Sequence, residues 1–233
     1  MKEFLKVILH PVPAPEGVDT GLRFTDVLFG FVIRELFIRI QNQNWTHFPD
    51  AVQLQLIVGT TLVLGSWIGF RGSLHRSSYK LKFFNLPLFR FLVDQLMLVL
   101  YFRIAVLTPE PGVNKSIPAP SELTKDTAQF VMLVFFLYVV WDLLGIWMAK
   151  AKVKTVDDGV KPRYPELDKD DNMTNNEQLV NWSGTLITVG CLLFLGVLWL
   201  LADCLSSFPI LLTTTVVLLA YRWCKEIRTS HLS

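Results

Sequence analysis

Charged residues are scarce in this sequence. They make up 18% of the chain, whereas apolar residues make up 52% and the mean hydropathy is +0.41. Soluble globular proteins typically contain about 25% charged residues, so this balance argues against a soluble fold. The net charge is only +2, and we expect no nucleic-acid partner from so small an excess of basic residues.

Residues that carry catalytic or metal chemistry are also few. The four histidines all lie outside the long hydrophobic segments, and Cys191, Cys204 and Cys224 have no paired or metal-ligand spacing. Phosphate-binding loops, dinucleotide-binding glycine patterns and the Gly-x-Ser-x-Gly motif are absent from the sequence. We therefore expect a protein that is not an enzyme, with no catalytic residues, no cofactor and no metal ion.

Long hydrophobic segments are what the sequence has instead. Six of them occupy residues 24–41, 51–70, 87–107, 127–149, 183–202 and 207–222. Crossing a bilayer takes roughly 20 predominantly apolar residues, so the predicted fold class is all-α, a polytopic membrane protein with six transmembrane helices. The last segment is the shortest and opens near a proline, which leaves a re-entrant segment as an alternative there.

The distribution of lysine and arginine predicts the topology. From the N-terminal segment through the five connections to the C-terminal tail, the basic residues number 3, 0, 5, 2, 6, 0 and 3, when Arg90 is counted with the second connection and Arg222 with the tail. Basic connections stay in the cytoplasm, so both termini should be cytoplasmic. The predicted parts are a cytoplasmic segment (1–23), four helices (24–149), a cytoplasmic loop (150–181), two helices (182–223) and a cytoplasmic tail (224–233). No secretory signal is apparent, and we expect an integral protein of the plasma (inner) membrane.

Among the charged residues within the predicted spans, six are the informative ones: Arg34, Glu35, Arg39, Asp94, Arg103 and Asp142. Each would cost roughly 2.5–3.5 kcal/mol at a helix centre, so each should face protein or water. Their depths predict a buried network joining segments 24–41, 87–107 and 127–149, in which Arg34 pairs with Asp94 and Arg103 reaches Glu35. Such a network either fixes packing and subunit register or lines an ion or proton path.

Three shorter patterns each allow more than one interpretation. Gly65 and Gly69 form Gly-x-x-x-Gly, which permits close helix approach within one chain or between two chains. Asp94 and Asp142 could share a proton as in intramembrane aspartyl proteases, but Gly-x-Gly-Asp is absent. The stretch RFTD, residues 23–26, resembles in part a Phe-Ser-Asp signature of six-helix potassium channels. A helix N-cap at Thr25 or Asp26 explains the same residues, so no family is assigned.

Two polar connections predict contacts outside the bilayer. Arg71, Arg76, Lys80 and Lys82 alternate with aromatic residues and should contact anionic lipid at the inner surface. Residues 150–181 are too few for a core of their own. They indicate a docking segment for a cytosolic protein, with a structureless linker as the alternative. The residues we assign to docking are Lys161, Arg163, Asp168 and Lys169.

The function predicted from these features is that of a non-enzymatic, multi-pass membrane subunit. We expect a homo-oligomer in the lipid bilayer that acts as a membrane sensor or scaffold and engages a cytosolic protein. The alternative is an ion channel, pore or transporter that uses the charges within the spans. Both functions require the same residues, so the sequence does not separate them.

Overall fold

The computed structural model of the chain describes residues 20–43, 45, 50–76, 86–109, 118–157 and 174–230. These residues form six α-helices and no β-strand. The helices are α2 (Thr20–Gln41), α3 (Ala51–Arg76), α4 (Leu86–Ala105), α5 (Pro120–Asp157), α6 (Thr174–Leu201) and α7 (Ser207–Ser230). The predicted all-α fold class is confirmed, and each of the six hydrophobic segments lies in one helix.

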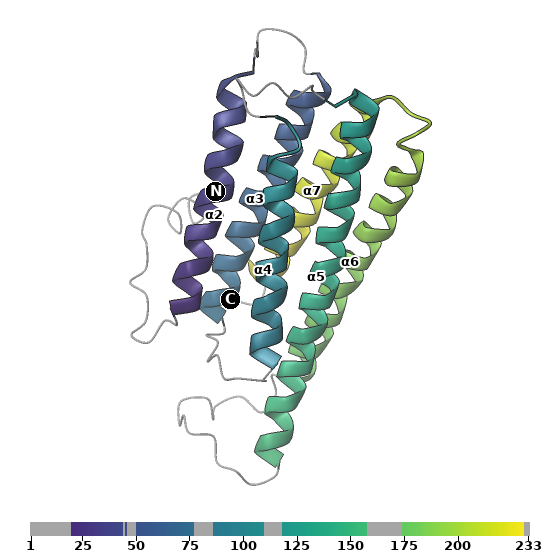
Figure 1. Cartoon of the computed structure of the whole chain (residues 1–233). Helices are drawn as coiled ribbons and strands as arrows, with labels where there is room; N and C mark the ends of the chain where they lie inside the picture. Colours follow the sequence, from purple (N-terminus) through teal and green to yellow (C-terminus); the bar gives the residue numbers. More distant parts are fainter. Residues whose placement is uncertain are drawn as a thin grey trace.

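The helices stand side by side and alternate in direction along the chain (Figure 1). α3 and α5 occupy the middle, because α3 packs against α2, α4, α5 and α7, and α5 packs against α3, α4, α6 and α7. We name the end of the bundle where α3, α5 and α7 begin the outer end, after the predicted topology, and the opposite end the inner end. The first helix therefore starts, and the last helix ends, at the inner end.

Four of these helices contain stretches long and apolar enough to cross a membrane: Ala51–Arg71, Pro120–Trp147, Gly184–Leu201 and Ser207–Lys225. This indicates a membrane protein. α2 and α4 fall short by composition because charges interrupt them; α4 alone carries Arg90, Asp94 and Arg103 within 20 residues. α7 is continuous over 24 residues, which disfavours the re-entrant alternative for its segment.

The bundle is apolar both inside and outside. Its centre is filled by Leu56, Val58, Tyr101 and Phe135, which are at most 1% exposed. Large apolar side chains also cover the outward faces, including Phe31, Leu96, Phe136, Leu193 and Val216. Outward apolar side chains on this scale fit contact with lipid, since water-exposed patches of this extent are rare on soluble monomers.

Two predicted loop ends are helical instead. Residues 120–126 form the start of α5, and residues 174–181 form the start of α6. Pro120 occupies the first turn of α5, where a missing N–H is tolerated, and Glu122 lies near the helix N-terminus. Helical turns outside a hydrophobic segment need no apolar residues, so hydropathy alone misses them. Thr25 and Asp26, expected at an N-cap, lie inside α2 because that helix starts at Thr20.

Candidate functional site

Near the outer end, a polar cluster joins α2 and α3 to the chain just after α4. Arg39, 5% exposed, places Nη1 2.8 Å from Glu35 Oε2, and its Nε donates to the Thr108 carbonyl at 2.8 Å. Thr108 Oγ1 donates to Gln55 Oε1, and Gln55 Nε2 donates to the Ile104 carbonyl. The i,i+4 pair expected between Glu35 and Arg39 is thus present, and every buried group in it has a partner.

Arg34 does not join a buried network. Its side chain is 66% exposed, and its Nη1 lies 2.9 Å from Glu35 Oε1 on the same helix. The predicted Arg34–Asp94 and Arg103–Glu35 pairs are therefore wrong. Consecutive helical residues point about 100° apart, so Arg34 falls on the outward face of α2, with Phe31, while Glu35 turns inward. Arg103 is exposed and makes no ion pair with any described residue.

Asp94 belongs to a second cluster, between α4 and α5. Its carboxylate is attracted by Arg90, one helical turn earlier, and the Arg90 Cζ lies 3.6 Å from the centre of the Trp141 ring. A side chain at Gly145 would approach the guanidinium, since a Cβ there would lie 3.9 Å from Arg90 Cζ. Asp94 is 4% exposed, and its Oδ2 has no hydrogen bond in the described part of the chain.

Asp142 belongs to a third cluster, which joins α5, α6 and α7. Lys225 Nζ lies 3.3 Å from Asp142 Oδ1, and Thr188 Oγ1 donates to Asp142 Oδ2 at 3.0 Å. The Tyr221 hydroxyl lies 3.3 Å from Thr188 Oγ1. Asp142 therefore pairs with a residue that we expected in the cytoplasmic tail. Asp94 and Asp142 have different partners, and the structure joins the six predicted charges into no single network.

Hydroxyl groups link the helices between these clusters. The Tyr138 hydroxyl of α5 hydrogen-bonds to Ser66 of α3 and lies 3.0 Å from the Tyr101 hydroxyl of α4. The Tyr138 ring also stacks on Tyr221 of α7, with 5.9 Å between ring centres. These tyrosines were not predicted as site residues because they occupy apolar positions. Arg90 and Lys225 were not predicted either, although the i,i+4 spacing of Arg90 and Asp94 is visible in the sequence.

The remaining predicted residues have structural roles or lie outside the described part. Gly65 and Gly69 make room for Arg222 of α7; a Cβ at Gly69 would lie 2.5 Å from Arg222 Nη1. Arg71 pairs with Asp26 at 3.0 Å. The Arg76 side chain and residues Lys80, Lys82, Lys161, Arg163, Asp168 and Lys169 lie outside the described residues.

In the described clusters most ion pairs lie within one helix, whereas the Asp142–Lys225 pair and most of the hydrogen bonds join different elements. In the described ranges, no group of three or more His, Cys, Asp and Glu side chains could hold a metal ion. This arrangement can hold the six described helices in register, and it leaves Arg34 and Arg103 on the outer surface of the bundle. Comparison with known proteins adds no family assignment: no family model, curated protein or solved structure matches the chain.

Proposed function

We propose that this chain is a non-enzymatic membrane subunit that acts as a sensor or scaffold and engages a cytosolic protein through residues 150–181. In this proposal all six helices cross the membrane and both termini lie in the cytoplasm. The observation that carries the proposal is the extension of α5 beyond its apolar stretch.

The apolar stretch of α5 ends at Trp147, but the helix continues to Asp157. These ten further residues (157 − 147 = 10) add about 15 Å of helix at 1.5 Å per residue. The extension projects past the inner ends of α2, α3 and α4 (Figure 1). It includes Lys150, Lys152 and Lys154, which favour the cytoplasmic side. A helical arm of this kind would present residues 158–173 to a protein in the cytoplasm.

The place of α2 and α4 in the bundle supports six spans. Both pack against α3 and against each other, and they contain 22 and 20 residues, close to the roughly 20 needed to cross a bilayer. Apart from Arg34 and Arg103, their outward faces are apolar, with Phe24, Val27 and Phe31 on α2 and Leu92 and Val99 on α4. These faces suit lipid, and Arg39, Arg90 and Asp94 are turned inward.

A conduction path through one chain has less support. Fully buried apolar and aromatic side chains fill the centre of the bundle, and Glu35, Asp94 and Asp142 each have a cationic neighbour. Ion pairs of this kind suit helix packing, although buried pairs need not add net stability. We therefore assign these residues to structure rather than to transport.

The proposal is tested by deleting residues 160–176. We expect normal membrane insertion and thermal stability, because residues 160–176 are mostly polar and lie outside the hydrophobic segments. We also expect loss of the cytosolic proteins that cross-link to the wild-type chain. A variant with the same residues in scrambled order serves as a control for length and composition. The proposal fails if the deletion variant keeps the same cross-linked proteins and the same cellular activity.

A further inference from the structure

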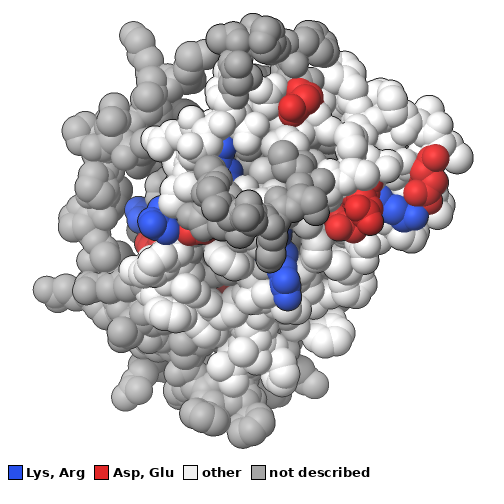
Figure 2. All heavy atoms as spheres, turned by 45° about the horizontal axis from the view of Figure 1, so that its top comes forward, with Lys and Arg blue, Asp and Glu red and all other residues white. Residues whose placement is uncertain are grey.

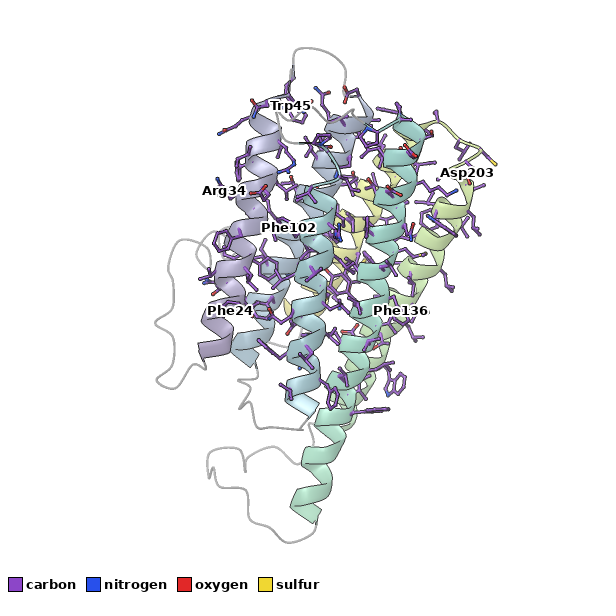
Figure 3. All side chains as sticks on the ribbon, in the orientation of Figure 1. Phe24, Arg34, Trp45, Phe102, Phe136 and Asp203 are labelled. Atoms are coloured by element: carbon purple, nitrogen blue, oxygen red, sulfur yellow. The ribbon has the colours of Figure 1, made fainter. Side chains whose placement is uncertain are left out.

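One face of the bundle combines an apolar groove with charges of both signs. The groove has a volume of about 450 Å³ and lies between α4 and α5. Its walls include Phe89, Leu92 and Leu96 of α4 and Val140, Leu144 and Trp147 of α5. We call this surface the α4–α5 face. Phe102 and Phe136 also project outward from the two helices (Figure 3).

Each of these two helices has a stripe of outward side chains that ends in charged residues toward the outer end. On α4 the stripe continues from Leu92 through Leu96 and Val99 to Arg103, with spacings of three or four residues. On α5 the corresponding stripe runs from Phe136 back through Leu133 and Gln129 to Asp126 and Glu122. Arg103, Asp126 and Glu122 are exposed, and none forms an ion pair or a side-chain hydrogen bond with a described residue.

Arg103 and Asp126 lie at similar depths. The starts of α3, α5 and α7 are level, because Ser207 donates to the Pro120 carbonyl and Asp50, Pro120 and Ser207 line one hollow. Gln55 lies four residues, about 6 Å, below the start of α3 and bonds to the Ile104 carbonyl, so Arg103 is also near that depth. Asp126 lies six residues, about 9 Å, below the start of α5.

Opposite charges on one face make it self-complementary. A two-fold axis along the membrane normal keeps depth unchanged, so it would bring Arg103 of each copy toward Asp126 of the other. Figure 2, which brings the outer end forward, shows basic side chains at the left, centre and right and acidic side chains at the top, left and right. Two such pairs would form at once, and the apolar stripes of α4 and α5 would face those of the opposite copy at the same depth.

We propose that two copies of this chain pair through their α4–α5 faces, with reciprocal Arg103–Asp126 contacts. This rests on the membrane-spanning arrangement proposed above and names a second copy as the partner. A second copy fits better than a phospholipid, since a phosphate that attracts Arg103 is repelled by Asp126 and Glu122. Arg103 cannot lose its charge at the edge of the bilayer, so an acidic partner at its depth is strongly favoured.

Charge exchange tests the pairing. Dimer formation is measured by energy transfer between labelled chains in neutral phosphatidylcholine liposomes, over a range of protein-to-lipid ratios. Arg103→Asp and Asp126→Arg should each weaken self-association at least about tenfold, because each brings like charges together. When the two single variants are mixed, a dimer with one copy of each has two contacts between opposite charges. One is the native Arg103–Asp126 pair, and the other is the same pair with its charges exchanged. The mixed pair should recover to within about threefold of wild type.

Asp203→Arg is the matched control, because it makes the same change in charge as Asp126→Arg at an exposed residue of the α6–α7 connection, where it removes only an exposed ion pair with Lys125. It should leave dimer formation unchanged, and all variants should match wild type in thermal stability in detergent. The pairing is overturned if wild-type chains stay monomeric at every ratio, or if the mixture of single variants associates no better than either alone. Either result would leave the docking proposal for residues 150–181 intact, since its test depends only on the cytosolic segment.

Discussion

Two arginines of α2, five residues apart, have opposite environments. Arg34 and Arg39 both contact Glu35, yet Arg34 is 66% exposed and Arg39 only 5% exposed. Arg39 also donates to the Thr108 carbonyl, so it ties α2 to the chain that follows α4. The charges were visible in the sequence, but their partners were not. Pairing depends on the rotation of each helix, and an error of one residue moves a side chain by about 100°.

The contrast predicts unequal effects of one substitution. Arg39→Gln should lower the free energy of unfolding by about 1–3 kcal/mol, because it leaves buried acceptors unsatisfied. Arg34→Gln should change it by less than about 1 kcal/mol, since the pair is exposed. Thermal unfolding of detergent-solubilised protein measures both. Equal losses for the two variants would contradict the burial difference.

At the scale of helices, glycines mark where two elements approach closely. A Cβ at Gly59 of α3 would lie 3.2 Å from Ile104 Cγ2 and 3.3 Å from Leu36 Cδ2, whereas a Cβ at Gly190 of α6 would meet nothing within 4 Å. Gly59 therefore permits the crossing of α2, α3 and α4. The sequence motif pointed instead to Gly65 and Gly69, which accommodate Arg222.

This difference can be measured with matched variants. Gly59→Val should destabilise the bundle by about 1–3 kcal/mol, the usual effect of overpacking a core. Gly190→Val introduces the same side chain with the same helix propensity at an open position, so its effect should be much smaller. Thermal stability in detergent provides the comparison. If both variants lose the same stability, helix propensity rather than packing at Gly59 is responsible.

At the scale of the whole molecule, the testable feature is the proposed topology. Reporter fusions after Thr155 and Arg228 should be cytoplasmic, and fusions near Asn44 and Asn114 should be external, because basic connections resist translocation. Fusions on both sides of α2 and α4 examine the two helices whose charges weaken their hydropathy. An external Arg228 fusion would remove one span and contradict the alternation of basic connections.

The number of helices in the described part of the chain and their approximate bounds were predictable, because a long hydrophobic segment satisfies its own backbone groups best as a helix. The polar starts of α5 and α6 were not, since helices outside the bilayer need no apolar pattern. Of the candidate site, the Glu35–Arg39 pair followed from local spacing. The Asp142–Lys225 pair joins residues 83 positions apart, and its prediction required knowing which helices are neighbours.

α5 is one unbroken helix of 38 residues, about 57 Å long. Asp126 lies near one end, and the projecting arm forms the other. If two copies pair at their α4–α5 faces, this rod would also fix the distance between two cytoplasmic arms. A partner with two binding sites would then engage the second arm at a high effective concentration, which can raise overall affinity by about 10²–10⁴. Pairing within the membrane would thereby control binding in the cytoplasm through avidity, with no change in the docking segment itself.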